Sequence, residues 1–528
     1  MRTRIPLRLL ELNSPMMWQW PHIEEIVALM QRQHFNGLIF QQENLWSLLA
    51  HPSGHCRFDR ENLERGRIDS LLFLKRVIRY CKQYGISVWL QGAANLTDGL
   101  LLQKHPEYPL IDTQESDELF WTQFLCQVMT EIFVELADIR GIIVNLAPPD
   151  VGRANLDVLL GVLYRTTRSH RKRLVVRENM ENIWQRWHFN NVISSMPPDV
   201  RVSLKATESG YRPGLPNNPS IAEMPGRIKW VEYDMWGVEF GWTLLPCYLL
   251  EEIQGRLCWA NAVGGNELEA ISCKLSWEWV SNSSLVNSIN SVNLQGLAMY
   301  GNELELPERD VFHIWLSEVL QRPVKDDESR RLQTLFSQSF EWIRKTTYML
   351  GHLVQTHSQI PESYEQALQL LFYGRYNMDP LYVGQSLFSS DDPQSGLEEL
   401  HLIKLEKEHA KFLAQLARNQ VHELTQSIAM PDQFRDLLLR VYERVPWYTE
   451  IFTRVCQGVA ARYFIQRYYR HPEVYRVLKQ EIEQMRQLVV DIENWLDEGR
   501  HRHPHYLSLL FDPQRLLALA EDLSRVDD

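Results

Sequence analysis

Eight short runs rich in β-branched residues recur along the first 300 residues, and helical stretches separate several of them. The runs are residues 7–12, 37–41, 86–91, 141–145, 174–177, 202–205, 229–234 and 270–276. Repeated strand–helix units predict a parallel α/β sheet. Eight units in about 300 residues are typical of a (β/α)₈ TIM barrel. The alternative is an open doubly wound sheet, but no GxGxxG or GxxxxGK(S/T) motif follows any run, which removes its usual nucleotide-binding function.

Helical periodicity predicts helices over residues 69–84, 116–137 and 156–169, with Asp69 as an N-cap and Gly85 just after the helix end. Beyond residue 306 glycine and β-branched residues become sparse. Helices are expected there over residues 327–351, 396–428, 431–445, 455–470 and 472–499. We therefore expect a catalytic-type barrel over residues 1–305, followed by an all-α C-terminal domain over residues 306–528.

Charge and cysteine usage exclude several classes of function. The net charge is −12 and no long basic run occurs, so neither nucleic acid nor an anionic membrane is an expected partner. Arg8 and Glu11 interrupt any apolar core near the N-terminus, and no uncharged apolar stretch is long enough for a membrane span. The seven cysteines are scattered and form no CxxC pair, which favours a cytoplasmic protein without disulfides, a metal site or a cofactor.

Polar side chains occur at the ends of all eight predicted strands, which predicts a hydrated, charged pocket at the carboxyl end of the barrel, where active sites of this fold lie. They are Glu11, Asn13, Gln41, Glu43, Gln91, Asn95, Asn145, Arg177, Glu178, Lys205, Glu208, Glu232, Asp234, Glu239, Lys274 and Glu278. The side chains of Arg177, Lys205 and Lys274 either pair with an acidic substrate group or neutralise neighbouring carboxylates.

Tryptophans lie on or just after several strands, namely Trp89, Trp236, Trp242, Trp277 and Trp279. Each belongs either to the core or to a platform on which the apolar face of a sugar stacks. Together with paired carboxylates, they favour a carbohydrate ligand and glycoside hydrolysis, in which one carboxyl protonates the leaving oxygen and the other activates water or attacks carbon.

The seventh strand places Glu232, Asp234 and Trp236 on one face, and Glu239 follows just past the strand end. Glu239 is therefore the best candidate for a catalytic carboxylate; its alternative role is a cap or an ion pair in the loop. We expect Glu232 and Asp234 to lie deeper and to pair with Lys205 or Lys274. On the eighth strand, alternation predicts that Cys273 points outward, toward the helices.

Several motifs, taken in order, resemble the catalytic barrel of the α-glucuronidases of glycoside hydrolase family 67. Residues 84–94, YGISVWLQGAA, are similar to the family's YGIKVYLSVNFASP. Residues 202–219 are similar to IKYGPIDFQVREPVSPLF, residues 232–241 to ELQITQEYLG, and residues 290–298 to AEANxYAFGRLAW. The resemblance covers most of the first 310 residues, and it implies a barrel followed by a helical C-terminal domain.

The resemblance also implies roles for individual residues. Glu239 aligns with a Glu of the family's catalytic base pair, and Lys205 aligns with the lysine of the family's IKYGPIDFQ stretch. The other member of that base pair is the Asp of GPIDFQ; the nearest carboxylate in this chain is Glu208, which lies two positions before the aligned place. Pro149 occupies the place of the family's general acid, and Asp150 is next to it.

The sequence therefore predicts a glycoside hydrolase that acts on a small oligosaccharide containing a uronic acid. Glu239 is the expected base or nucleophile, and Asp150 or Glu208 the expected acid. The expected substrate-binding residues are Lys205, Arg177, Asp234, Glu232, Asn145, Trp89, Trp236 and Lys274. The alternatives are a sugar-binding barrel that has lost hydrolysis, in keeping with Pro149, and a lyase or isomerase of sugar acids. The apolar stripes of the helical domain predict a homodimer.

Overall fold

The computed structural model describes residues 4–14, 17–42, 44–52, 61–93, 115–146, 156–178, 183–207, 215–233, 235, 243–275, 284–355, 357–373, 386–468 and 471–525. Eight parallel strands close into a barrel in sequential order, and the first strand pairs with the eighth. They are β1 (Leu7–Leu12), β2 (Gly37–Gln41), β3 (Ser87–Ala93), β4 (Gly141–Leu146), β5 (Arg173–Glu178), β6 (Arg201–Lys205), β7 (Lys229–Tyr233) and β8 (Leu268–Lys274). The predicted (β/α)₈ barrel is confirmed.

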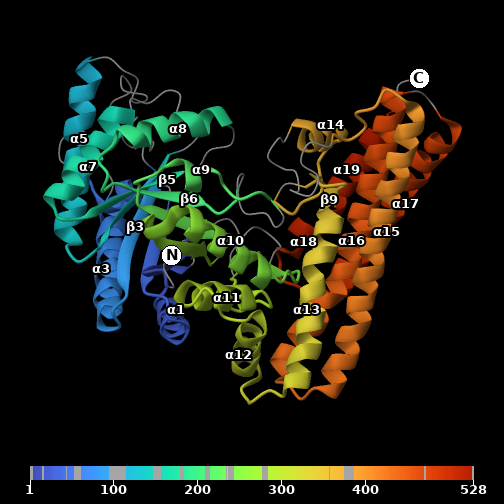
Figure 1. The fold of residues 1–528 in the computed structure, drawn as a ribbon, viewed down its shortest axis with the longest axis horizontal. Coiled ribbons are helices and arrows are strands. Elements are labelled where there is room, and N and C mark those ends of the chain that lie inside the picture. The colour runs from blue at the N-terminus through green and yellow to red at the C-terminus, as the bar shows by residue number, and fades with distance from the viewer. Residues whose placement is uncertain are drawn as a thin grey trace.

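Helices surround the barrel and connect its strands (Figure 1). They are α1 (Trp20–Gln33), α2 (Leu45–Leu49), α3 (Glu61–Gln83), α5 (Glu115–Glu135), α7 (Leu156–Ser169), α8 (Ile183–Ser195), α9 (Ser220–Glu223), α10 (Leu250–Gly264), the short 3₁₀ helix Gly265–Glu267 and α11 (Ser291–Asn302). Gly85 follows α3 with a positive φ of 69°, as predicted. The predicted cap at Asp69 is wrong, because α3 begins eight residues earlier, at Glu61, and Asp69 lies inside it.

An apolar layer fills the middle of the barrel. It consists of inward-pointing side chains from seven strands, namely Leu9, Ile39, Trp89, Ile143, Val175, Trp230 and Ala270. Below it, toward the amino ends of the strands, the carboxylate of Glu269 accepts hydrogen bonds from Arg201 and from the indole of Trp230, at 2.6 and 2.9 Å. Charged and aromatic side chains therefore fill the barrel at this end, and active sites of this fold lie at the other, at the carboxyl ends of the strands.

The C-terminal region is helical, as predicted. Its elements are α12 (Glu308–Leu320), α13 (Asp326–Thr347), α14 (Tyr364–Leu368), a π-helical turn (Gln369–Tyr373), α15 (Pro393–Ser427), α16 (Asp432–Arg467), α17 (Pro472–Glu498), α18 (Leu507–Leu510) and α19 (Pro513–Ser524). In Figure 1 the long helices α13, α15, α16 and α17 run side by side, next to the barrel. Across the described ranges, none of the helices is long and apolar enough to cross a membrane.

Two predicted boundaries in this region are wrong. The stretches 431–445 and 455–470 form one helix, α16, because tertiary packing along the helix outweighs the cost of about 3 kcal/mol for the internal Pro446. The stretch 327–351 does not remain helical to its end. It leaves α13 at Thr347 and forms a small hairpin, β9 (Tyr348–Met349) and β10 (His352–Leu353). The buried ammonium of Lys407 donates to the carbonyl oxygens of Lys345 and Tyr348, which satisfies this helix end.

Candidate active site

A layer of polar side chains lies above the apolar layer, toward the carboxyl ends of the strands. Alternation along each strand points one such side chain inward from every strand. We call this set the polar belt: Glu11, Gln41, Gln91, Asn145, Arg177, Lys205, Glu232 and Lys274. The strand register pairs Glu11 with Lys274, Gln41 with Gln91, Asn145 with Arg177, and Lys205 with Glu232. The belt therefore combines three cations, two carboxylates and three amides in one ring.

The best-defined contact in the belt joins Arg177 and Glu232. The Arg177 Nε and Nη2 atoms donate to the two carboxylate oxygens of Glu232 at 2.5 and 2.7 Å. Both side chains are almost fully buried. The prediction that Glu232 pairs with Lys205 or Lys274 missed this partner, because sequence alternation shows which face a residue occupies but not which cation reaches it.

Lys205 lies beside this ion pair. Burial, together with the positive charges of Arg177 and Lys274, lowers the pKa of its ammonium to about 8, whereas Glu232 and Glu178 oppose the shift. Repulsion between the three cations means that an anionic ligand group would stabilise the charged form of Lys205. The structure thus brings together the three cations that the sequence predicted for substrate binding.

Two amides in the belt are suited to hydroxyl recognition. The Gln91 Nε2 and Asn145 Oδ1 atoms are buried, and neither has a hydrogen-bond partner within the described part of the chain. A buried polar atom without a partner costs about 1–3 kcal/mol, which a bound hydroxyl would offset. These side chains come from the neighbouring strands β3 and β4.

Glu178, the residue after Arg177, points to the other side of the strand and links the end of β5 to two neighbouring segments. Its carboxylate accepts from the amide of Asn218 at 2.7 Å and from the Arg186 Nε at 3.3 Å. Burial raises the pKa of the Glu178 carboxyl, which Arg186 and Asn218 oppose. Sequence reasoning marked Glu178 as polar but missed both partners, because they lie eight and 40 residues further along the chain, on α8 and in the segment before α9.

Trp89 is not a sugar platform. Its indole is fully buried in the apolar layer, packs edge-on against Trp230 at 4.7 Å and donates to the hydroxyl of Ser87 at 3.2 Å. The prediction that it binds substrate is corrected, because inward-pointing positions near the middle of β3 fill the barrel instead of lining its opening. Cys273, in contrast, points outward into the core beneath the helices, as predicted.

Five of the predicted site residues lie outside the described residues. They are the three catalytic candidates Glu239, Asp150 and Glu208, and the substrate-binding candidates Asp234 and Trp236. Their roles stay predictions.

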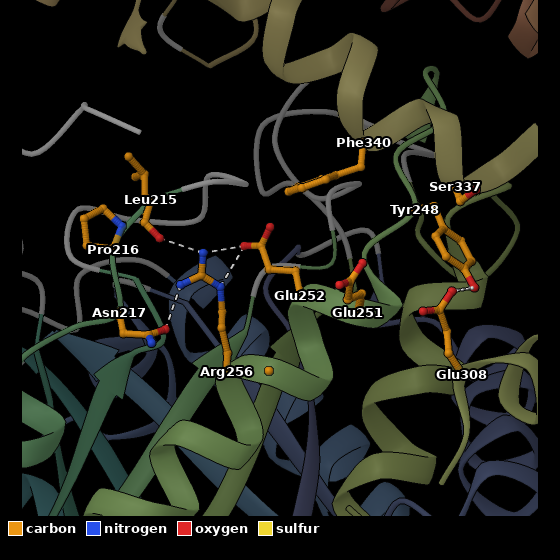
Figure 2. A pocket seen from close by; sticks show the side chains of 11 residues that line it. Leu215, Pro216, Asn217, Tyr248, Glu251, Glu252, Arg256, Glu308, Ser337 and Phe340 are labelled. Carbon is orange, nitrogen blue, oxygen red and sulfur yellow. Dashed lines mark hydrogen bonds and ion pairs between the residues drawn. The ribbon is translucent and has the colours of Figure 1, made fainter. Parts of the chain in front are cut away.

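A separate cavity of about 710 Å³ lies between the barrel and the helical region (Figure 2). Arg256 of α10 crosses one side of it and donates to Asn217 at 2.9 Å and to Glu252 at 2.7 Å. Across the cavity, the hydroxyl of Tyr248 donates to Glu308 at 2.7 Å. Among the described residues, the charged groups that line it are three carboxylates, Glu251, Glu252 and Glu308, and the guanidinium of Arg256. This acidic lining suits an acidic sugar less well than the polar belt does.

Comparison with protein-family models and with curated proteins finds no match. Among solved structures, the chain is similar to a GH138 enzyme targeting pectin rhamnogalacturonan II, with 10% identity and a TM-score of 0.66. This likeness covers 94% of the chain and 62% of that enzyme, so the chain spans less than two thirds of its neighbour's length. A mutant of the O-GlcNAc hydrolase from Thermobaculum terrenum gives 11% identity, a TM-score of 0.45, and coverage of 98% and 95%. The first likeness shows the fold, a (β/α)₈ barrel with a helical C-terminal region.

Proposed function

We propose that this protein is a glycosidase that acts on a small oligosaccharide containing a uronic acid, in the manner of an α-glucuronidase. The observation that carries the proposal is the polar belt, in which each strand contributes one polar side chain above a closed apolar layer. The belt lies toward the carboxyl ends of the strands, which is where active sites of this fold are found. The GH138 neighbour, which targets pectin, supports a sugar as the ligand.

The charges of the belt support an acidic sugar in particular. Arg177, Lys205 and Lys274 come from three different strands, and the first two lie within reach of Glu232. In our proposal the carboxylate of the uronic acid binds near Lys205 and Lys274, while Arg177 keeps Glu232 ionised and oriented. Gln91 and Asn145 then hydrogen-bond the ring hydroxyls.

The bond-breaking step is assigned to the loops that follow the strands. Glu239 acts as base or nucleophile, and Asp150 or Glu208 protonates the leaving oxygen. The second candidate function is sugar binding without hydrolysis, which the proline at position 149, in the place of the family's general acid, favours.

A turnover screen run beside binding calorimetry tests the two functions. Aryl glycosides and aldouronic oligosaccharides serve as substrates for the wild type and for Glu239→Gln, Asp150→Asn and Glu208→Gln. Glu239→Gln should lower kcat by at least about 100-fold and leave sugar binding intact. Whichever of the other two substitutions is equally damaging identifies the acid. Sugar binding without turnover of any substrate would contradict hydrolysis and favour the second function.

The proposal extends to a homodimer formed through the helical region. Leu402, Leu405 and Phe412 are exposed along one side of α15, with spacings of three and seven residues. Apolar side chains in such a row support a helix–helix contact. Light scattering at micromolar concentration should give twice the chain mass, and Phe412→Glu should lower it. A monomeric wild type would contradict this assembly.

A further inference from the structure

Two tryptophans on the outer face of α8 are unusually exposed. The side chains of Trp184 and Trp187 are 78% and 62% exposed, although tryptophan is highly buried on average. His188 and Asn191 are exposed as well. The four residues are spaced at i, i+3, i+4 and i+7, so they share one face of the helix. We call this face the α8 platform.

The α8 platform begins at the same end of the barrel as the polar belt, at the carboxyl ends of the strands. Helix α8 follows β5, so its first turn is at the carboxyl ends of the strands, on the outside of the barrel (Figure 1). Arg186 fixes this turn from the opposite face of the helix, because its guanidinium binds Glu178 at the end of β5. Glu178 in turn directly follows the belt residue Arg177. The indoles are thus anchored to the strand that supplies a belt cation.

The composition of the α8 platform fits a sugar chain better than a protein. An indole face offers a flat apolar surface to the C–H face of a pyranose ring, and the His188 and Asn191 side chains offer hydrogen bonds to hydroxyls at its border. A stable protein interface needs about 800 Å² on each partner with a contiguous apolar centre. On this helix, the exposed neighbours of the two indoles are polar.

We propose that the α8 platform binds the outer residues of a polysaccharide whose end enters the polar belt. This inference rests on the proposed function and adds the size of the substrate: the natural ligand is an extended, uronic-acid-containing chain. Sugar residues that stack on Trp184 and Trp187 raise the affinity for the polymer and leave the affinity for a short sugar unchanged.

Affinity gel electrophoresis in polygalacturonate and in glucuronoxylan tests the proposal, with calorimetry on a uronic acid disaccharide as the second measurement. The variants are Trp184→Ala/Trp187→Ala and the matched control Tyr84→Ala, an exposed aromatic residue at the amino end of β3, the opposite end of the barrel. We expect the double variant to bind at least one polymer about fivefold more weakly or worse, with unchanged disaccharide binding. The Tyr84→Ala variant should behave as the wild type in both measurements.

Three results would overturn the inference: equal polymer retention by the double variant and the wild type, no retention of the wild type by either polymer, or a change of oligomeric state in the double variant, which would make the face a contact between copies. Failure of the proposed glycosidase function would give a different result: the disaccharide would neither bind nor be hydrolysed. Polymer retention that depends on Trp184 and Trp187 would in that case still support a sugar-binding face on α8.

Discussion

Arg177 of β5 and Glu232 of β7 form a bidentate ion pair across β6. The Arg177 Nε and Nη2 atoms lie 2.5 and 2.7 Å from the two carboxylate oxygens of Glu232. Lys205, from β6 itself, lies in the field of both groups, which is why its pKa responds to each of them. Charged groups this deep in a barrel are costly to bury and stabilise the fold little, so their arrangement is better explained by ligand recognition.

Removing one partner of this ion pair should lower the stability of the protein more than removing both partners. Arg177→Met leaves the carboxylate of Glu232 buried with one cation fewer, so the free energy of unfolding should fall by about 3–5 kcal/mol. Arg177→Met/Glu232→Leu should recover part of that loss. Urea unfolding measures both, and Lys82→Met is the control, because its exposed ion pair with Asp138 should contribute less than about 1 kcal/mol. Strictly additive losses would contradict the coupling.

Binding of a uronate should weaken as the pH rises through about 8. Lys205 is mostly protonated below its pKa of about 8 and mostly neutral above it, whereas the sugar carboxylate stays ionised throughout. Between pH 7 and pH 9 the affinity should therefore fall by up to about tenfold. In Lys205→Met it should be low and independent of pH over this range. Calorimetry at several pH values measures the effect, and an equally strong pH dependence in the variant would assign it to another group.

The correction at Trp89 has its own test. Trp89→Phe removes the indole hydrogen bond to Ser87 and part of the packing against Trp230, so the protein should lose on the order of 1–3 kcal/mol of stability. Its affinity for a uronic acid disaccharide should stay within about twofold of the wild type, as expected for a residue of the apolar layer. A selective loss of sugar affinity with unchanged stability would restore the platform role.

Cys273 provides a check on the barrel register. Its side chain is buried on the outer side of β8, whereas its neighbour Lys274 points inward. Cys273→Ala should cost about 1 kcal/mol of stability, because a small buried side chain is shortened, and turnover should be unchanged. Loss of turnover in a stably folded variant would contradict the outward orientation.

The sequence predicted the strands well because parallel strands buried on both faces appear as separate apolar runs, whatever their contacts. Each of the eight strands of the barrel coincides with a predicted run to within two residues at both ends. Pro446 shows the limit of local reasoning. Its local signal is a break, but the packing of α16 along its length, which no local pattern reveals, keeps the helix continuous.

The site was predicted in its composition but not in its contacts. The polar residues at the strand ends predicted a charged pocket that contains Asn145, Arg177, Lys205, Glu232 and Lys274, all of which belong to the polar belt. They did not reveal that Arg177 reaches Glu232 across β6, because that depends on the tilt of the strands around the closed barrel. The exposed pair Trp184 and Trp187 was missed for another reason. At helical spacing, apolar residues are normally assigned to the buried side of a helix.

The most direct test of the proposed function compares two disaccharides that differ only in one group: a uronic acid disaccharide, and its neutral analogue with CH₂OH in place of the carboxylate. Steady-state hydrolysis of each by the wild-type protein gives the ratio of the two kcat/KM values. Pairing of the carboxylate with Lys205 and Lys274 predicts that the uronide is hydrolysed with a kcat/KM at least about tenfold higher. Hydrolysis of neither compound, or equal hydrolysis of both, would contradict an acidic-sugar glycosidase.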